Sequence, residues 1–296
     1  MGFYSFVKRK KLGVITKKMR FKDLTTIKVG GKIQYFYCPN DTNSLIKAMR
    51  YIHRKKLAFF ILGNGSNIIA SDKKFKKIVI SLKKMPEKMD VKDGIVTVSA
   101  NYMAGRLTNN LARYGYKNLE FISGIPGTIG GIIAMNAGCF GFEIKDYIES
   151  CLVMDETGRI RRLTKEELEL RYRNSVIKES NMICLEANFY VNKTEENLFK
   201  IIEEFKNKKI EAQPTDKPSA GSIFKNPKHY HAFELISHAN LMGKRIGNAM
   251  ISTKHGNFII NLGNAKSSDV KGLILYIKNI IYERFKINLE TEVIIL

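Results

Sequence analysis

The sequence predicts an α+β protein folded in two or three lobes. Its 296 residues exceed one typical domain of about 100–200 residues, and 44% of them are hydrophobic, which is enough for sizeable cores. Predicted strands outnumber helices and occur in runs between them, whereas a doubly wound sheet would alternate single strands with single helices. A proline-containing stretch at 212–227 reads as a long loop before the C-terminal part of the chain.

The individual elements follow from hydrophobic periodicity. Alternating or short apolar runs predict strands at 33–38, 58–62, 78–82, 95–100, 148–154, 160–163, 181–191, 258–261 and 289–295. Apolar residues at helical spacing predict helices at 41–54, 103–114, 195–208, 231–240 and 268–285. Residues that favour N-caps precede two of these helices: Asp41 or Thr42 for the first, and Ser267 or Ser268 for the last.

The chain is strongly basic, with a formal net charge of +22. Residues 1–22 hold eight Lys or Arg and no acid, show no clear periodicity, and are expected to form a basic, mobile N-terminal arm. Nucleic acid is one explanation of the charge, because polyanions favour dense Lys and Arg. The remaining lysines are scattered, however, and no nucleic-acid motif follows. We therefore expect no nucleic-acid partner; the charge also suits a dianionic nucleotide diphosphate.

Neither a membrane segment nor a metal site is expected. No run approaches the roughly 18–20 apolar residues of a membrane helix, and the basic N-terminus lacks the apolar core of a secretory signal. We therefore expect a cytoplasmic protein with no membrane and no obligate protein partner. The four cysteines form no CxxC pair and have no histidine at metal-ligand spacing, so they are predicted to be reduced, packed thiols: Cys38, Cys139, Cys151 and Cys184.

Two glycine-rich segments are candidates for phosphate binding. The first is GNGSN, directly after an apolar strand: Gly63, Asn64, Gly65, Ser66 and Asn67. Its glycines permit positive φ and convergent N–H groups, although such loops often only turn the chain. The second is SGIPGTIGG at 123–131, continued by MNAG at 135–138, where Pro126 could open a helix whose N-terminus favours a pyrophosphate. Two such loops suggest a large dinucleotide that is bound differently from the dinucleotides of Rossmann folds.

Four further segments are polar in ways that loops or surfaces also explain. RYRNS at 171–175 follows a helical stretch, and PSAGSIFKNP at 218–227 places a hydroxyl, a cation and an amide between two prolines. In LETEV at 289–293, strand alternation puts Glu290 and Glu292 on one face. His255, in KHGNFIIN at 254–261, has no obvious Ser, Cys or acid partner, so it is interpreted as structural or ligand-polarising.

In this order, with TTIKVGG at 25–31, the motifs resemble those of the UDP-N-acetylenolpyruvoylglucosamine reductase (MurB) family. The resemblance covers residues 21–296. The absence of an insertion between RYRNS and the serine loop is similar to the shorter, type II form of the family.

The resemblance implies a two-lobed FAD-binding domain of the vanillyl-alcohol-oxidase (PCMH-like) kind plus a C-terminal α+β substrate-binding domain. The lobes would be 23–90, 91–209 and 210–296, with the last strand able to return to the flavin lobe. FAD would be held non-covalently, and NADPH would be the co-substrate that reduces it. The implied FAD-binding residues are Gly63, Asn64, Gly65, Ser66, Asn67, Gly124, Ile125, Pro126, Gly127, Thr128, Gly130, Asn136 and Gly138.

The resemblance also implies the reaction: reduction of the enolpyruvyl group of UDP-N-acetylglucosamine enolpyruvate to UDP-N-acetylmuramate in peptidoglycan precursor synthesis. Ser222 would donate the proton, and Arg173 and Glu292 would sit at the carboxyl end of the substrate. Developing negative charge there needs cations and donors aimed at it. The implied substrate-binding residues are Tyr172, Lys225 and Asn226.

Three positions depart from the family pattern. Lys74 and Lys77 stand where glycines are usual, which bears on FAD retention, and Ile132 stands where a small residue is common. The nearest rival is another flavoenzyme of the same superfamily, such as an oxidase with covalent FAD. Covalent attachment usually needs a His or Cys beside the pyrophosphate loop, and GNGSN contains neither.

Overall fold

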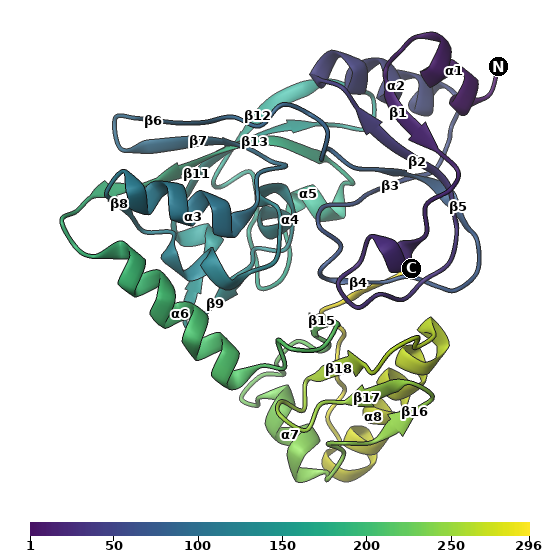
Figure 1. The fold of residues 1–296 in the computed structure, drawn as a ribbon, viewed down its shortest axis with the longest axis vertical. Coiled ribbons are helices and arrows are strands. Elements are labelled where there is room, and N and C mark those ends of the chain that lie inside the picture. Colours follow the sequence, from purple (N-terminus) through teal and green to yellow (C-terminus); the bar gives the residue numbers. More distant parts are fainter. The chain divides into compact units, whose positions relative to one another are not determined.

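A computed structural model describes residues 1–296, which form two compact units, each with its own hydrophobic core (Figure 1). Neither unit is continuous in the sequence. Unit 1 comprises Met1–Lys17, Tyr35–Asn64 and Lys77–Asn207, and unit 2 comprises Lys18–Gln34, Gly65–Lys76 and Lys208–Leu296. The mixed helix and strand content confirms the α+β class.

Two larger sheets and two strand pairs build unit 1. One sheet has the order β1-β2-β5-β3: β1 Gly13–Thr16, β2 Ile33–Pro39, β5 Phe75–Ile80 and β3 Phe59–Ile61. The other is antiparallel, in the order β12-β11-β13-β7-β6: β12 Ile160–Thr164, β11 Ile148–Met154, β13 Ile183–Tyr190, β7 Ile95–Ser99 and β6 Met89–Lys92. The short pairs are β8 Tyr116–Lys117 with β14 Asn192–Lys193, and β9 Gly138–Cys139 with β10 Phe142–Glu143.

Six α-helices belong wholly or partly to unit 1: α1 Phe3–Arg9, α2 Thr42–Arg54, α3 Ala104–Arg113, α4 Ile129–Ala134, α5 Val176–Glu179 and α6 Leu198–Ala212. Asp41 caps α2 as predicted, since its Oδ1 accepts a hydrogen bond of 2.7 Å from the Ser44 N–H. A 3-10 helix, Glu120–Gly124, leads into the segment before α4. The helix predicted at 195–208 is shifted: α6 begins later, runs to Ala212 and crosses from unit 1 into unit 2.

The expectation that residues 1–22 form an unpacked arm is wrong. Phe3 and Val7 of α1 are buried in the core of unit 1, and the Phe3 ring lies edge-on to Tyr37 with centroids 5.6 Å apart. The Tyr37 hydroxyl donates to the Leu12 carbonyl at 2.9 Å, and β1 pairs antiparallel with β2. Seven-residue α1 is too short to show a clear period in the sequence, and its apolar residues gain stability by packing.

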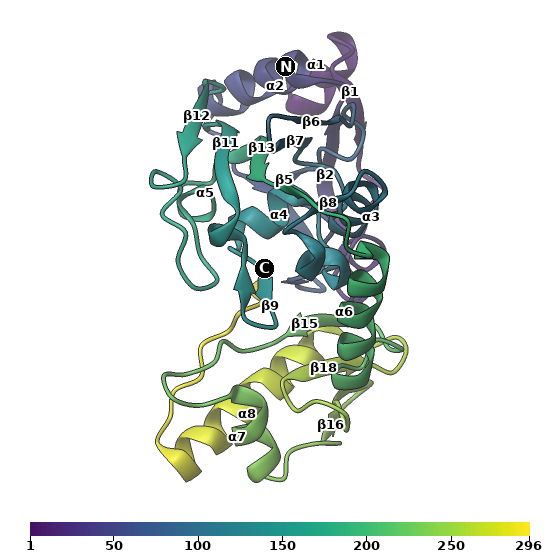
Figure 2. The same cartoon turned by 90° about the vertical axis from the view of Figure 1, so that its left-hand side faces the viewer.

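Unit 2 is organised around a small antiparallel sheet and two helices. The sheet order is β15-β18-β17-β16: β15 Ser219–Ser222, β18 Phe258–Asn261, β17 Ala249–Ile251 and β16 Arg245–Ile246. The helices are α7 Ala232–His238 and α8 Ser267–Phe285, which lie side by side (Figure 2). The loop predicted at 212–227 is therefore interrupted by a strand, because Ser219 and Ser222 pair with β18.

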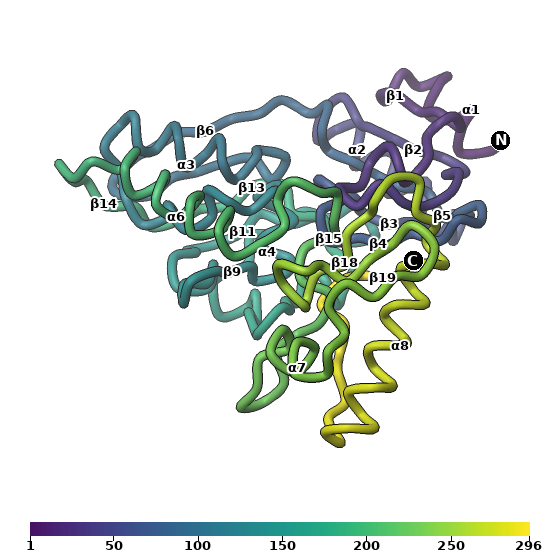
Figure 3. Tube along the Cα trace, turned by 60° about the horizontal axis from the view of Figure 1, so that its bottom comes forward, coloured from purple at the N-terminus to yellow at the C-terminus, as the bar shows by residue number.

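The last strand is shorter than predicted. Only β19 Ile294–Ile295 is a regular strand, and it pairs in parallel with β4 Ile68–Ile69, which follows the first glycine loop (Figure 3). Residues 289–293 contact the chain through single backbone bonds instead, such as Lys225 N–H to the Glu290 carbonyl at 2.9 Å. Leu289 and Val293 are nevertheless buried in the core of unit 2.

The first N–H groups of α8 are hydrogen-bonded by the side chain of Asp72, a residue far from the helix in the sequence. The two carboxylate oxygens of Asp72 accept from the N–H groups of Ser267 and Ser268, at 3.1 and 3.3 Å. The predicted serine cap is thus wrong: both serines lie inside the helix, Lys266 is the N-cap residue, and the side chain of Asp72 bonds the first turn. A carboxylate at this end also complements the helix dipole.

No helix combines the length and the apolar composition that crossing a bilayer would require.

Candidate active site

The first glycine loop offers unused backbone donors. The N–H groups of residues 63–67 donate no hydrogen bond within the chain, and Gly65 is buried. Gly65 has φ +69°, and a Cβ there would lie 2.2 Å from the Leu24 carbonyl oxygen, so only glycine fits. Buried, unpaired N–H groups are costly unless a ligand accepts from them. The buried N–H of Gly65 is therefore available to an acceptor from outside the chain.

Unit 1 brings the start of this loop against the second glycine segment. Asn64 Nδ2 donates to the Pro126 carbonyl at 2.7 Å. A Cβ on Gly63 would lie 2.8 Å from the Thr128 hydroxyl oxygen, so the absent side chain keeps the two segments close. The structure thus brings together Gly63, Asn64, Pro126 and Thr128, which belong to two motifs separated in the sequence.

The N-terminus of α4 is less available to a phosphate than expected. The Ile129 N–H donates to the Tyr102 carbonyl at 2.9 Å, and the Gly130 N–H donates to the Ala100 carbonyl at 2.8 Å. The Gly131 N–H is directed to the Thr128 hydroxyl at 3.4 Å. These donors are already used, so the prediction that the helix end itself receives a pyrophosphate is corrected. The Thr128 N–H, just before the helix, remains without an acceptor in the chain.

Ser123, the first residue of this segment, has a buried hydroxyl for which the sequence predicted no role. Ser123 is 8% exposed, and its Oγ has no hydrogen-bond partner in the chain. A buried hydroxyl of this kind is normally satisfied, so it marks a place where a polar ligand group belongs. Within unit 1, the Thr128 N–H and the Ser123 hydroxyl are thus both without an acceptor or partner in the chain.

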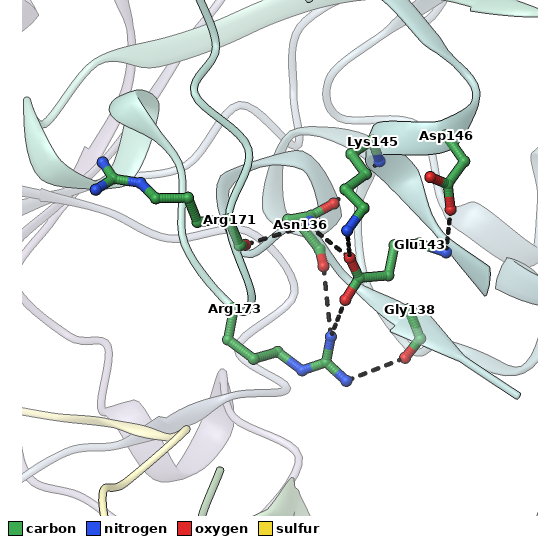
Figure 4. Close-up of polar contacts among 7 residues, drawn as sticks. All are labelled: Asn136, Gly138, Glu143, Lys145, Asp146, Arg171 and Arg173. Carbon is green, nitrogen blue, oxygen red and sulfur yellow. Dashed lines mark hydrogen bonds and ion pairs between the residues drawn. The ribbon is translucent and has the colours of Figure 1, made fainter. Parts of the chain in front are cut away.

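Asn136 and Gly138, which are predicted to bind the cofactor, lie next to Arg173 (Figure 4). The Asn136 carbonyl accepts from Arg173 Nη1, and the Gly138 carbonyl accepts from Arg173 Nη2, each at 3.4 Å. Glu143 adds a carboxylate, with Oε1 3.7 Å from Arg173 Nη1. The Arg173 and Glu143 side chains are only 17% and 19% exposed. The MNAG and RYRNS motifs, which are separate in the sequence, therefore form one cluster in the structure.

The conformation of Arg173 is unusual for a non-glycine residue, with φ +57°. Backbone hydrogen bonds in both directions between Arg171 and Asn174, at 3.1 and 3.0 Å, close the turn that imposes this conformation. The Arg173 guanidinium also lies over the Tyr172 ring, with Cζ 4.8 Å from the ring centroid. Strained backbone of this kind is found at sites where a side chain must be aimed.

In unit 2, Ser222 is the last residue of strand β15, and its side chain has no hydrogen-bond partner in the chain. Its Oγ forms no hydrogen bond within the chain, and the preceding Gly221 has φ +76°. A Cβ on Gly221 would meet no atom within 4 Å, so the surroundings are open there. Two residues later, the Phe224 N–H and carbonyl both bond the buried side chain of Asn257, at 2.9 and 2.8 Å. The serine is thus placed by a fixed backbone while its hydroxyl stays available.

Glu292 and Asn67 meet in the same unit. Asn67 Nδ2 donates to the Glu292 carbonyl at 3.2 Å, and the Glu292 N–H donates to the Ile223 carbonyl at 2.8 Å. The C-terminal segment therefore lies between the end of the first glycine loop and the residue after Ser222. This juxtaposition of three distant segments could not be read from the sequence.

Lys225 and Asn226, predicted to bind substrate, already have partners in the chain. Lys225 Nζ lies 3.2 Å from Glu290 Oε2, in a pair whose acid is 76% exposed and is therefore weakly held. Asn226 Oδ1 accepts from the Ala232 N–H at 3.0 Å, at the start of α7. Asn226 Nδ2 also lies 3.3 Å from His231 Nδ1, so both residues contact their own unit.

His255 lies among aromatic rings in unit 2, with one ring nitrogen hydrogen-bonded to the backbone. Its ring packs against Phe233 and Phe258, with centroids 5.1 and 4.9 Å away, and its Nδ1 accepts from the Asn257 N–H at 3.2 Å. Burial lowers the pKa of His255, which keeps the imidazole neutral near pH 7.

The cysteines are free thiols, as predicted, and three of the four are buried. No group of three or more His, Cys, Asp or Glu side chains is arranged to hold a metal ion.

Comparison with known proteins agrees with this geometry. Residues 33–164 match the model of an FAD-binding domain, and residues 213–296 match the C-terminal domain of UDP-N-acetylenolpyruvoylglucosamine reductase. The fold and the site define an FAD-dependent oxidoreductase.

The UDP-N-acetylenolpyruvoylglucosamine reductases of Alkaliphilus oremlandii and Caldicellulosiruptor saccharolyticus are 37% and 39% identical to the chain. The alignments cover 92% and 94% of the chain and 90% of each relative. The chain belongs to the UDP-N-acetylenolpyruvoylglucosamine reductase family.

Solved structures give the same result. The crystal structure of the Thermus caldophilus enzyme of this family matches with a TM-score of 0.82 and 30% identity, covering 96% of this chain and 99% of that one. The berberine bridge enzyme of Eschscholzia californica matches with a TM-score of 0.50 and 14% identity, over 65% of this chain and 43% of that one. The second likeness is one of fold alone.

Proposed function

We propose that this chain reduces the enolpyruvyl group of UDP-N-acetylglucosamine enolpyruvate to UDP-N-acetylmuramate, with NADPH as electron donor, for peptidoglycan synthesis in the cytoplasm. The observation that carries the proposal is a Ser222 hydroxyl without a partner in the chain, two residues before the Phe224 backbone that Asn257 fixes. The hydrogen bond that joins the two glycine segments supports it. Residues 23–209 would hold FAD, and residues 210–296 would bind the sugar nucleotide.

FAD, when bound, supplies the hydride that saturates the carbon–carbon double bond. Non-covalent binding is supported by the absence of His and Cys from residues 63–67 and 123–131. The first glycine loop would hold the pyrophosphate through its free N–H groups, and Thr128 and Ser123 would add further donors. Pro126 and Asn64 would keep the two glycine segments together, since they are already hydrogen-bonded.

Ser222 would donate the proton that completes the reduction at the α-carbon. A serine hydroxyl is a weak acid, but it meets a strongly basic carbanion-like centre. General-acid catalysis typically contributes about 10²–10⁴ in rate. The lack of an intramolecular partner for Ser222 Oγ leaves its proton free for this transfer.

Arg173 and Glu292 would stabilise the substrate at its carboxyl end. Negative charge that develops on the α-carbon and its carboxylate is stabilised by a fixed cation, and Arg173 is held in place by two carbonyls and one carboxylate. Glu292 would have to be protonated or bridged by a donor there, because two adjacent carboxylates repel. Tyr172, Lys225 and Asn226 would contact the rest of the substrate.

The proposal is tested by following the flavin in two half-reactions under anaerobic conditions. The purified, yellow protein is reduced with NADPH, and the enolpyruvyl UDP-sugar is then added in a stopped-flow instrument. We expect bleaching with NADPH and full return of absorbance with the sugar. A reduced flavin that the sugar leaves unchanged would contradict the proposed substrate.

Substitution of the serine sharpens the test. Ser222→Ala should be reduced by NADPH at the wild-type rate but reoxidised by the sugar at least about 100-fold more slowly. Ser219→Ala, in the same strand and likewise without a hydrogen-bonded side chain, is the matched control and should behave as wild type. Equal reoxidation rates for both variants would remove Ser222 from the mechanism.

A covalent-flavin oxidase is the second candidate from the same superfamily. Acid precipitation separates the two, because a non-covalent flavin stays in the supernatant. Yellow precipitate, together with reoxidation by oxygen but not by the enolpyruvyl UDP-sugar, would favour the oxidase.

A further inference from the structure

Both oxygens of the Glu143 carboxylate contact neighbouring side chains (Figure 4). Its Oε2 accepts from Asn136 Nδ2 at 3.1 Å and lies 2.8 Å from Lys145 Nζ. Glu143 itself is fixed by the β9–β10 hairpin, where it pairs with Gly138. Since one oxygen is anchored in this way, the other oxygen is aimed at Arg173.

Asn136, the residue that anchors Glu143, is itself rigid. It is fully buried, with φ +39°, and its Nδ2 also donates to the Arg171 carbonyl at 3.1 Å. Its Oδ1 accepts from the Lys145 N–H at 3.0 Å. One amide therefore fixes both the hairpin that carries Glu143 and the turn that carries Arg173.

The contacts of Arg173 with Asn136, Gly138 and Glu143 orient its guanidinium. Their lengths are 3.4, 3.4 and 3.7 Å, whereas a tight arginine–carboxylate pair has two parallel bonds of about 2.7–2.9 Å. A guanidinium carries five N–H donors. Glu143 and the two carbonyls therefore orient Arg173 through contacts longer than those of a tight ion pair.

We propose that Glu143 is a positioning residue, which fixes the Arg173 guanidinium where the carboxylate of the enolpyruvyl group binds. The inference rests on the proposed function of Arg173 and adds how that side chain is aimed. Glu143 also separates Arg173 from Lys145: with it, the three side chains carry a net charge of +1, and without it they would carry +2.

This charge balance lets positioning be distinguished from electrostatics. Glu143→Gln keeps the size of the side chain and its oxygen acceptor but removes the charge. If Glu143 affected only the local charge, the variant would attract the anionic substrate more strongly, with a lower KM and an undiminished kcat. If Glu143 positions Arg173, kcat for reoxidation falls although the local charge has become more positive.

The experiment uses the FAD-loaded enzyme, reduced with NADPH and mixed with the enolpyruvyl UDP-sugar. We expect Glu143→Gln to be reduced by NADPH at the wild-type rate and reoxidised about 10–100-fold more slowly, the size of effect that small misplacements cause. KM should not rise in parallel. Glu169→Gln and Glu179→Gln are the matched controls, because these acids pair with neighbouring, exposed Arg171 at 3.2 and 3.1 Å, and both should match wild type.

A second arm asks whether Glu143 acts through Arg173. In an Arg173→Ala background, the Glu143→Gln change should slow reoxidation no further. A further loss there, or wild-type reoxidation by Glu143→Gln alone, would overturn the proposal. If Glu143→Gln lost its flavin, Glu143→Asp replaces it: this variant keeps the charge but shortens the reach, and a wild-type reoxidation rate would count equally against positioning.

The outcome for the wild-type enzyme separates this inference from the proposed function. If reduced wild-type enzyme were not reoxidised by the sugar, the proposed substrate would be wrong, whatever Glu143 does. If wild type reacts and the Glu143 variants react equally fast, only the positioning role fails.

Discussion

The side-chain amide of Asn257 bonds both backbone groups of Phe224: its Nδ2 donates to the carbonyl at 2.8 Å, and its Oδ1 accepts from the N–H at 2.9 Å. Asn257 is 4% exposed, and Phe224 is fully packed in the core of unit 2. Because Ser222 lies two residues earlier, this pair sets the path of the strand that presents the candidate proton donor. The structural role of Asn257 was not apparent from KHGNFIIN.

Replacing Asn257 by alanine should destabilise the protein and misplace Ser222. Each buried backbone group left unpaired costs about 1–3 kcal/mol, so the free energy of unfolding should fall by at least this amount in urea titrations. Substrate-driven reoxidation should slow even where the variant is fully folded. Asn207→Ala, on an exposed face of α6, is the control and should change stability by less than about 0.5 kcal/mol.

Substitutions at Gly127 and Ile132 should have non-additive effects on the free energy of unfolding. A Cβ on Gly127 would lie 2.8 Å from Ile132 Cγ2, at one of the positions where this chain departs from the family pattern. Overpacking of this kind costs about 1–3 kcal/mol, so Gly127→Ala should lower stability and flavin retention.

The Ile132→Ala change should relieve the clash, so that the double variant is more stable than the sum of the two single changes predicts. Ile133→Ala is the matched control: Ile133 is equally buried but does not lie within 4 Å of that Cβ position. The coupling energy, about 0.5–3 kcal/mol for residues in contact, is read from urea unfolding of the four combinations. If Ile132→Ala and Ile133→Ala offset the destabilisation by Gly127→Ala equally, the new Cβ at residue 127 would not act through a direct contact with Ile132.

Asp72 should contribute measurably to stability through the N-terminus of α8. Removing a capping side chain typically costs about 1 kcal/mol, and Asp72→Ala leaves two N–H groups without their acceptor. Asp72→Asn should recover part of this loss, since an amide oxygen still accepts. Exposed Asp216→Ala, which removes an acid from a loop of the same unit, is expected to leave the unfolding midpoint unchanged.

His255 should make stability depend on pH. Its pKa in the folded protein is lowered by burial, below the value of about 6.5 for an unfolded histidine. The unfolded state therefore binds more protons at mildly acidic pH, so this contribution is complete above about pH 6.5 and is lost as pH falls toward the folded pKa.

Urea midpoints measured between about pH 7.5 and 5.5 test this expectation. The wild-type midpoint should fall across the range, and His255→Gln should show a smaller fall. His53→Gln changes an exposed histidine of α2 and should keep the wild-type dependence. Identical pH profiles for wild type and His255→Gln would show that the buried ring does not titrate on unfolding.

Many helices and strands were predictable from the sequence, and some of those not predicted have a recognisable sequence pattern. Helix α2 with its Asp41 cap, and strand β11 at 148–154, follow directly from local periodicity. The β6–β7 hairpin was missed, although its turn is Asp93–Gly94, a dipeptide typical of tight hairpins, with φ +51° and +75°. Helix α1 has no comparable signal, because seven residues span only two turns.

The candidate site was predicted in its parts but not in its arrangement. The glycine loops, Ser222 and Arg173 came from motifs whose residues are neighbours in the sequence. The contacts that organise them join residues far apart in the chain, such as Asn64 with Pro126, Arg173 with Asn136, and Asp72 with Ser267. Sequence periodicity carries no information about such pairs.

The sequence by itself determined the class of the fold, most helices and strands, the family and the residue types available for chemistry. These depend on local spacing and on motifs that stay intact in the unfolded chain. The tertiary structure decided which donors remain free, why Asn136 and Gly138 serve an arginine, and how Glu143 holds Arg173. The physical reason is that a buried polar group must find a partner, and only the folded chain determines whether that partner is another residue or a ligand.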